Sequence, residues 1–189
     1  MKTIILVANE DEASHIRDLE SDTCNIIITG EGRTNVITTI ARALKDGKIT
    51  DNDTIINIGY AGAYGYEKGD IVYVDRVEPF TPSKTIIEPP MTLNNDVEKM
   101  KSIFISGQCL TADNFVEIDD INPDLPKQFV CDMELYWISL MLNNVISLKI
   151  VSDNLKYAEY TEANFERSWE KIRNVLKELL WNFLLPTYI

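Results

Sequence analysis

Short apolar runs alternate along the chain with segments whose apolar residues recur at helical spacing. The runs are rich in Ile and Val, which suits strands covered on both faces, and they lie at 3–8, 25–29, 54–58, 71–74, 103–106 and 147–151. Helices are predicted over about 9–18, 36–45, 134–143 and 159–185, the last with an apolar stripe of Phe165, Trp169, Ile172, Val175, Leu176 and Leu179. This alternation predicts an α/β fold: one domain over residues 1–189, with a mixed, mostly parallel central sheet flanked by helices.

The stretch 53–70 is the centre of this pattern. A buried run at 54–58 leads into the small residues of 59–63, and a second β-branched run opens after Gly69 and Asp70. We expect a strand, a glycine loop and a strand. The loop would be the floor of a ligand site, because small residues let a flat ligand approach the backbone closely. A plain turn is the commoner explanation of Gly-x-x-Gly in this position.

Prolines interrupt the middle of the chain. They stand at positions 79, 82, 89 and 90 and preclude a regular helix there, so 78–90 is expected to be a loop or an edge strand. A short extended run is expected at 128–131.

The composition limits the partners. The formal net charge is −12, and no basic patch is visible, which argues against nucleic-acid binding. The apolar run near the N-terminus is too short for a signal sequence, and no stretch is long enough to cross a membrane. We therefore expect a cytoplasmic protein with a small-molecule partner, no membrane and no nucleic acid.

Cysteine and histidine are scarce. Cys24, Cys109 and Cys131 are widely spaced within or beside apolar runs, which predicts buried free thiols in a reducing compartment. His15 is the single histidine of the sequence, so a histidine-based triad or metal site has almost nothing to build on. We expect no metal and no organic cofactor.

A set of polar and aromatic residues follows the predicted strands. In an open α/β sheet, ligands collect beyond the carboxyl ends of the strands. Glu12, Phe115, Glu134 and Asp153 are placed there, together with the 59–62 loop. Such a set suits acid–base work on a ligand that has a flat ring and hydroxyl groups. The simpler alternative is that the carboxylates cap helices or turns and that Phe115, like Met133, belongs to the core.

Seven short motifs make the interpretation more specific. They are ANEDE at 8–12, TGEGR at 29–33, NIGYAG at 57–62, KGDIV at 68–72, TADNF at 111–115, DME at 132–134 and VSD at 151–153. Their order resembles the nucleoside phosphorylase and nucleosidase superfamily, and more closely its 5′-methylthioadenosine/S-adenosylhomocysteine nucleosidases. The resemblance implies the nucleoside phosphorylase type of fold and a homodimer.

The resemblance also implies roles for particular residues. Glu12 would activate the attacking water, and Asp153, oriented by Ser152, would protonate the leaving base. Glu134 would hold the ribose hydroxyls, and Phe115 would stack on the base. The implied substrate-binding residues are Tyr60, Ala61, Gly62, Phe115, Val116, Met133, Glu134 and Ser152. Glycosidic cleavage places positive charge on the sugar and negative charge on the base, so a carboxylate near the sugar and a proton donor at the base both favour the transition state.

Hydrolysis is favoured over phosphorolysis. A phosphorylase needs cationic groups around its phosphate, and only Arg33 lies in a candidate loop, beside Glu31. A phosphorylase and a nucleoside-binding protein without turnover remain the alternatives. Several residues depart from the family pattern: Asn9 stands where methionine is usual, and the bulky Tyr60 stands where a small residue is usual. The pocket is therefore expected to suit a different base or 5′ group, such as that of a modified purine or deazapurine nucleoside.

Overall fold

The structure is a computed structural model that describes residues 1–81, 90–93, 98–121, 124–156, 158 and 165–184. Its strands are β1 (Thr3–Val7), β2 (Cys24–Ile28), β3 (Thr54–Tyr64), β4 (Ile71–Phe80), β5 (Met91–Thr92), β6 (Ile105–Ala112), β7 (Phe129–Asp132) and β8 (Val145–Asp153). Its helices are α1 (Glu10–Ser14), α2 (Gly32–Lys45), α3 (Glu98–Ile103), α4 (Leu135–Met141) and α6 (Glu166–Leu184), with short 3-10 turns η1 (Arg17–Leu19) and η2 (Ile118–Asp120).

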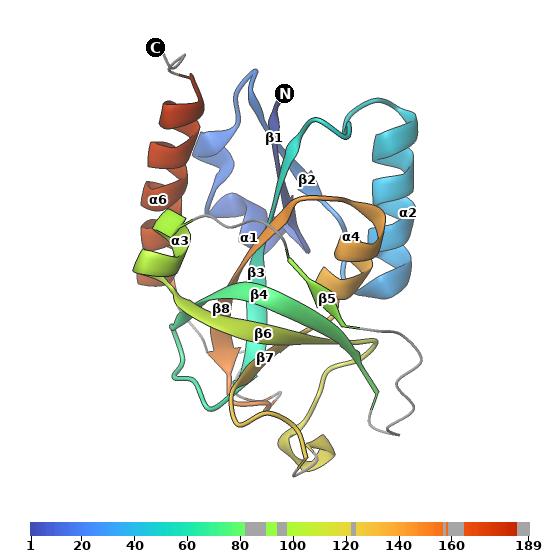
Figure 1. The fold of residues 1–189 in the computed structure, drawn as a ribbon, viewed down its shortest axis with the longest axis vertical. Helices are drawn as coiled ribbons and strands as arrows, with labels where there is room; N and C mark the ends of the chain where they lie inside the picture. The colour runs from blue at the N-terminus through green and yellow to red at the C-terminus, as the bar shows by residue number, and fades with distance from the viewer. Residues whose placement is uncertain (82–89, 94–97, 122–123, 157, 159–164, 185–189) are drawn as a thin grey trace.

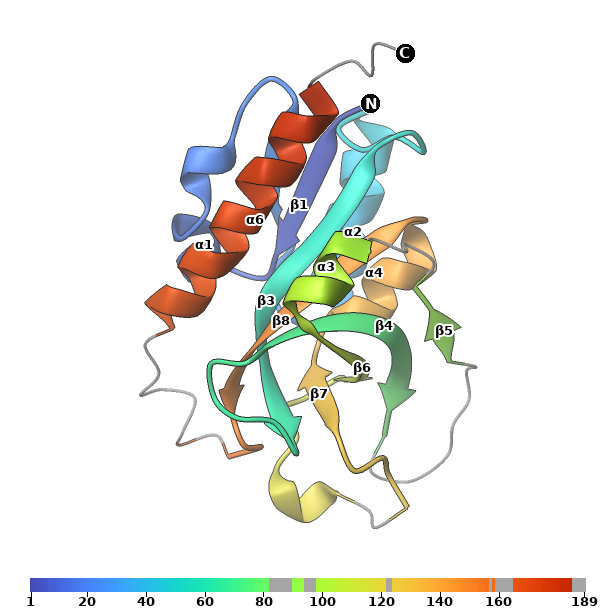
Figure 2. The same cartoon turned by 60° about the vertical axis from the view of Figure 1, so that its left-hand side comes forward.

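The long strand β3 belongs to two parts of one sheet (Figure 1). Its first half pairs in parallel with β1, which pairs in parallel with β2. Its second half pairs with β7, and β8 runs beside it in parallel over most of its length. The pairs β8–β4, β4–β6 and β6–β7 then close a ring back to β3, so this part of the sheet is a small barrel, as Figure 2 shows from another side. The sheet is mixed and mostly parallel, as predicted.

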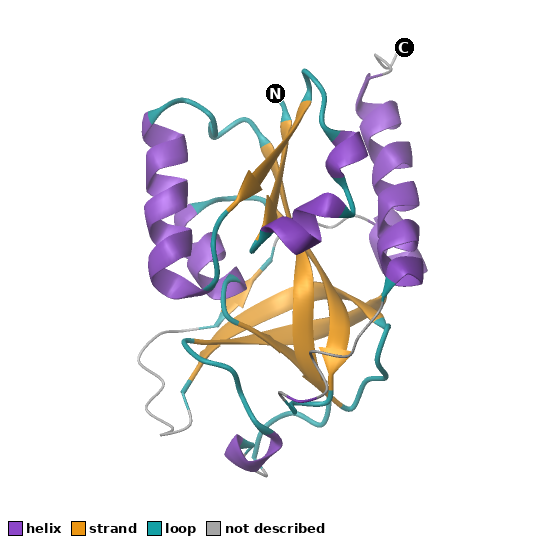
Figure 3. Ribbon diagram, turned by 180° about the vertical axis from the view of Figure 1, so that it is seen from behind, coloured by secondary structure: helices purple, strands orange, loops and turns teal. Residues whose placement is uncertain are grey.

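Two helical layers cover the open part of the sheet (Figure 3). Alternate residues of the strands face opposite layers, as the two-residue period of a strand requires. Ile4 and Leu6 pack with residues of α2 and α4, whereas Ile5 and Val7 pack with residues of α1, α3 and α6. The near-continuous apolar runs in the sequence are therefore explained by burial on both faces.

The structure corrects several predicted boundaries. The expected glycine loop at 59–63 is part of β3, and the strand expected at 103–106 starts later, because α3 ends at Ile103 and β6 begins at Ile105. The first helix ends at Ser14 and is followed by η1. In the proline-rich segment β4 extends to Phe80, with Pro79 paired to β6, while 82–89 lie outside the described residues, as do 159–164 and 185 of the predicted last helix.

The three cysteines are buried and form no disulfide, as predicted. Within the described residues, no helix combines the length and the hydrophobicity that crossing a bilayer requires.

Candidate active site

Three strand ends meet β3 between Asn57 and Gly62. β1 ends opposite Asn57, and β8 ends with Asp153 opposite Gly62. β7 runs antiparallel to β3 and reaches Gly62 at Cys131, so its carboxyl end also points back to the middle of that strand. The residues that follow these strands therefore meet, although they are distant in sequence.

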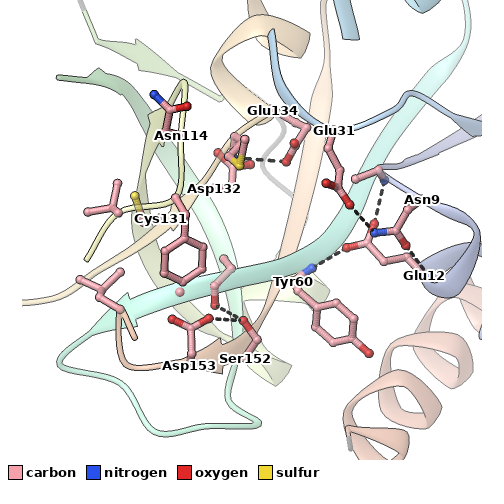
Figure 4. Close-up of a pocket in the computed structure, with 17 residues that line it drawn as sticks. Asn9, Glu12, Glu31, Tyr60, Asn114, Cys131, Asp132, Glu134, Ser152 and Asp153 are labelled. Carbon is pink, nitrogen blue, oxygen red and sulfur yellow. Dashed lines mark hydrogen bonds between the residues drawn. The ribbon is translucent and has the colours of Figure 1, made fainter. Parts of the chain in front are cut away.

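All ten predicted site residues line one cavity of about 440 Å³ (Figure 4). These are Glu12, Tyr60, Ala61, Gly62, Phe115, Val116, Met133, Glu134, Ser152 and Asp153. The cavity is also lined by residues that the sequence analysis did not assign to the site: Ala8, Asn9, Glu31, Asn114, Cys131, Asp132 and Leu155. The cavity lies at the ends of strands, as predicted. The residues of its floor, 60–62, belong to the strand β3 and not to a loop.

Backbone groups hold Glu12 in a fixed position. Its Oε2 accepts a hydrogen bond from the Ala8 N–H (2.7 Å), and its Oε1 accepts one from the Tyr60 N–H (2.8 Å). Burial raises the pKa of Glu12 above its usual value, while these two hydrogen bonds act in the opposite direction. Asn9 is the residue that caps α1, since its Oδ1 accepts the Glu12 N–H (3.0 Å), so the alternative that Glu12 is itself the cap is wrong.

Two glycines of β3 make room for two carboxyl groups. A Cβ atom at Gly59 would lie 2.7 Å from Glu12 Oε1, and one at Gly62 would lie 2.8 Å from Asp153 Oδ1. Both distances are shorter than van der Waals contact allows. These glycines therefore serve the carboxyl groups directly, whereas the sequence suggested that they bring a ligand close to the backbone. They stand three residues apart, roughly 10 Å along a strand.

Asp153 and Ser152 lie at an irregularity in the β3–β8 pairing. The register shifts between Ala61 and Gly62, so Ser152 is the extra residue and Asp153 faces Gly62; such bulges redirect side chains. The Asp153 side chain is fully buried. Ser152 Oγ lies 2.7 Å from Asp153 Oδ2 and 3.2 Å from the carbonyl oxygen of Ala61. A hydroxyl has one proton. The Ser152 hydroxyl can therefore donate to Asp153 or to the Ala61 carbonyl, one at a time, and Asp153 Oδ1 also accepts the Lys156 N–H (3.3 Å).

Glu134 is tied to the start of α2. Its Oε1 accepts the N–H of Gly32 (2.8 Å), the first residue of that helix, and its Oε2 accepts the N–H of Met133 (3.3 Å). Glu134 is the residue before α4, but its side chain makes no capping hydrogen bond there. Burial, together with the charge of Asp132, raises the pKa of Glu134 to about 7.

A buried ion pair lies behind these carboxylates. Lys149 Nζ lies 2.7 Å from Asp132 Oδ2, and both side chains are almost completely buried. Asp132 also accepts hydrogen bonds from Thr111 Oγ1 (2.6 Å) and from the Leu135 N–H (3.0 Å). Burial acts to lower the pKa of Lys149, but the neighbouring acidic groups, Asp132 foremost and Glu134 with it, together outweigh burial, so the pKa is raised and the ammonium is charged. Sequence reasoning placed Lys149 in a strand, and a lysine within an apolar run was the available signal.

The aromatic residues have different surroundings. Phe115 follows β6 and lines the cavity near Val116 and Leu155. Tyr60 contributes its backbone to the position of Glu12, while its ring lies edge-on to Trp169 (centroids 5.6 Å apart) and its hydroxyl accepts the Trp169 Nε1–H (2.8 Å). The bulky side chain is thus accommodated against α6, and the cavity remains open beside it (Figure 4).

The charges around the cavity are negative. The lining carboxylates are Glu12, Glu31, Asp132, Glu134 and Asp153, and the described lining residues include no lysine or arginine. Arg33 lies instead over the ring of Trp137 (4.1 Å to its centroid) and 3.9 Å from Asp113. In the described part of the chain, no group of three or more His, Cys, Asp or Glu side chains is arranged to hold a metal ion.

No protein-family model and no curated protein matches the chain. Solved structures do. A Streptococcus pyogenes S-adenosylhomocysteine nucleosidase, crystallised with 5-methylthiotubericidin, superposes with a TM-score of 0.79 at 19% identity, over 98% of each chain. An MTA/SAH nucleosidase of Streptococcus pneumoniae with 8-aminoadenine has a TM-score of 0.78 at 18% identity, over 95% of this chain and 99% of that one.

A 5′-methylthioadenosine/S-adenosylhomocysteine nucleosidase of Neisseria meningitidis, in complex with methylthio-immucillin-A, has a TM-score of 0.77 at 16% identity, over 95% of this chain and 99% of that one. These superpositions extend over nearly the whole chain, so the similarity concerns the complete fold and not a shared fragment. The protein therefore has the fold of the 5′-methylthioadenosine/S-adenosylhomocysteine nucleosidases, as its sequence motifs predict.

Proposed function

We propose that this protein hydrolyses the N-glycosidic bond of a purine-like nucleoside and releases the free base. The substrate is of the 5′-methylthioadenosine/S-adenosylhomocysteine type or a modified purine or deazapurine nucleoside. The observation that carries the proposal is the meeting of Glu12, Glu134 and Asp153 around one cavity, each of them buried and fixed by hydrogen bonds. The likeness of the fold to nucleosidases supports the same reaction.

The proposed mechanism begins at the sugar. Glu134 accepts hydrogen bonds from the ribose 2′- and 3′-hydroxyls, beside Met133. Glu12 takes a proton from the attacking water, and its raised pKa makes it a stronger base than an exposed carboxylate. As the glycosidic bond breaks, the positive charge on the sugar is stabilised by the ionised carboxylates nearby.

The leaving base is handled at the other end of the cavity. Asp153 gives its proton to a ring nitrogen of the base, and Phe115 stacks on the ring, with Val116 beside it. The Ser152 hydroxyl, which contacts both Asp153 and the Ala61 carbonyl, keeps the acid in orientation. The base then leaves neutral, and the water oxygen becomes the new hydroxyl of the sugar.

Hydrolysis suits this cavity better than phosphorolysis. A phosphate ion would enter a site lined by five acidic residues and by no lysine or arginine among the described ones, where its charge is repelled. A binding protein without turnover is the other alternative, but binding alone has little use for a buried acid such as Asp153 beside the leaving base.

We further propose a homodimer in the cytoplasm that acts in nucleoside salvage. The homodimer follows from the family resemblance. Ile37 of α2 and Leu140 of α4 are exposed on neighbouring helices, at 37% and 51%, and supply apolar surface that a second copy would cover.

The test is a chromatographic assay of the purified protein against a panel of nucleosides, with and without phosphate. The panel contains 5′-methylthioadenosine, S-adenosylhomocysteine, inosine, adenosine and deazapurine nucleosides. Release of free base without phosphate is expected. Release that requires phosphate would identify a phosphorylase, and binding without release would identify a binding protein.

Asp153→Asn tests the assignment of the acid. The amide has the same shape but no proton to give, so kcat is expected to fall by about 10²–10⁴-fold. Asp51→Asn, an exposed residue outside the cavity, is the matched control and should keep full activity. Turnover of Asp153→Asn within a few-fold of the wild type would exclude Asp153 as the acid.

A further inference from the structure

The two ends of the cavity differ in chemistry (Figure 4). At one end Asp153 lies among apolar neighbours, Phe115, Val116 and Leu155. At the other end lie Glu12, Asn9 and Glu31, and these three bring polar atoms. A ligand that fills the cavity therefore meets apolar side chains around Asp153 at one end and mainly polar side chains at the other.

Glu31 at the polar end is exposed, but hydrogen bonds hold the residues there in place. Asn9 Nδ2 donates to Glu31 Oε1 (3.1 Å), while Asn9 Oδ1 is occupied by the Glu12 N–H (3.0 Å), so the Asn9 amide is held on both sides. The Glu31 backbone is held too, because its carbonyl accepts from Asn35 Nδ2 (2.8 Å). Glu31 also directly precedes α2, the helix whose first N–H binds Glu134.

Glu31 has acceptor capacity to spare. Its Oε1 receives the Asn9 amide, and no described residue donates to Oε2. A carboxylate has about four acceptor positions, so it readily takes a further donor. An apolar group placed here would remove water from both polar side chains without replacing its hydrogen bonds, and an anionic group would meet the carboxylates of Glu31 and Glu12.

We infer that this end of the cavity selects a nucleoside whose C5′ substituent is a hydrogen-bond donor, a hydroxyl or an amino group, over one with a thioether or a phosphate. The inference rests on the proposed function. With the base at Asp153 and the ribose hydroxyls at Glu134, the C5′ end of the sugar is the part that remains to face Asn9 and Glu31. Glu31 is then a specificity-determining residue, and Asn9 positions it.

The experiment compares adenosine, 5′-deoxyadenosine and 5′-methylthioadenosine, which share a base and differ only at C5′. The trio is repeated with hypoxanthine as the base. Because a hydrogen bond to a charged group is worth roughly ten- to a hundredfold in binding, kcat/KM for the 5′-hydroxy compound is expected to exceed that for the methylthio compound by at least about tenfold. A wild-type preference for the methylthio compound in both series would overturn the inference.

Variants of Glu31 connect the preference to its cause. Glu31→Leu is expected to lower the ratio of hydroxy to methylthio kcat/KM by about tenfold, whereas Glu31→Gln keeps an acceptor oxygen and most of the preference. Glu20→Leu, outside the cavity, is the control for replacing a glutamate by leucine and should leave the ratio unchanged. A ratio that stays within twofold in Glu31→Leu would contradict the assignment.

Failure of the proposed function is recognised separately. If no nucleoside releases its base, hydrolysis is excluded, and the inference is decided by isothermal titration of the same trio. Tighter binding of the 5′-hydroxy compound, lost in Glu31→Leu, would support it. Equal affinities, or no binding, would overturn it.

Discussion

At the scale of single residues, the cavity is lined by four buried carboxyl groups and by one exposed carboxyl group, that of Glu31. Burial and the nearby charge of Asp132 raise the pKa of Glu134 from the usual 4.5 to about 7. In the folded protein this group holds a proton over a range in which the unfolded chain has released it. Its contribution to stability is therefore fully present below about pH 4.5 and is lost as the pH rises through about 7.

This shift predicts a measurable pH dependence. Between pH 5 and 8 the free energy of unfolding of the wild type should fall more than that of Glu134→Gln, by on the order of 1–3 kcal/mol, because glutamine does not titrate. Urea unfolding at a series of pH values measures both. Parallel curves for the two proteins would mean that Glu134 does not titrate in this range.

At the scale of elements, the carboxyl groups packed against β3 determine where that strand must have glycine. Gly59 lies where the Glu12 carboxylate needs the space of a Cβ, and Gly62 lies where Asp153 does. Glycine is uncommon inside a strand, because it has no side chain to pack and loses much backbone entropy on folding. Here the loss is accepted because two carboxyl groups must approach the backbone of one strand.

Gly59→Ala tests this account. The added methyl group should displace Glu12, reduce kcat by at least about tenfold and destabilise the protein by about 1–3 kcal/mol, as overpacking usually does. A double-mutant cycle with Glu12→Ala supplies the control, since the methyl group costs much less once the carboxylate is gone. Additive effects on the free energy of unfolding would show that the strain lies elsewhere.

At the scale of the whole molecule, the barrel encloses a charge pair. Lys149 on β8 and Asp132 on β7 belong to strands that both pair with β3, and their side chains meet within the closed ring. The same lysine lowers the pKa of both Glu12 and Glu134 by its charge, although burial prevails at each. The pair thus links closure of the barrel to the electrostatics of the cavity.

Lys149→Met is expected to destabilise the fold by about 3–5 kcal/mol, because it leaves Asp132 charged and without its cation. Adding Asp132→Asn should recover a large part of the loss, since the amide is neutral and its oxygen still accepts a hydrogen bond. Thermal and denaturant unfolding of the two variants decide the matter. If the double variant is as unstable as Lys149→Met, the lysine acts through packing and not through charge.

That the candidate site residues line one cavity was predictable, because these residues follow strands in short motifs. Glu12, Glu134 and Asp153 each stand at or just after the end of a predicted strand, and strand ends meet in any sheet of this class. Glu31 and Asn9 were visible in the same motifs, but nothing in their spacing indicates that they bond to each other. The ion pair of Lys149 could not be predicted from the sequence, because its partner Asp132 lies on another strand.

Local pattern was therefore sufficient for the layers, the strands and the principal carboxylates, since periodicity and strand ends are properties of neighbouring residues. The closed barrel, the roles of Gly59 and Gly62 and the polar end of the cavity arose only when distant strands came together. Gly59 looks like a turn residue in sequence, but it must lack a Cβ because the carboxylate of Glu12, on α1, lies against the backbone of β3. Contacts of that kind depend on register and closure, which no local pattern encodes.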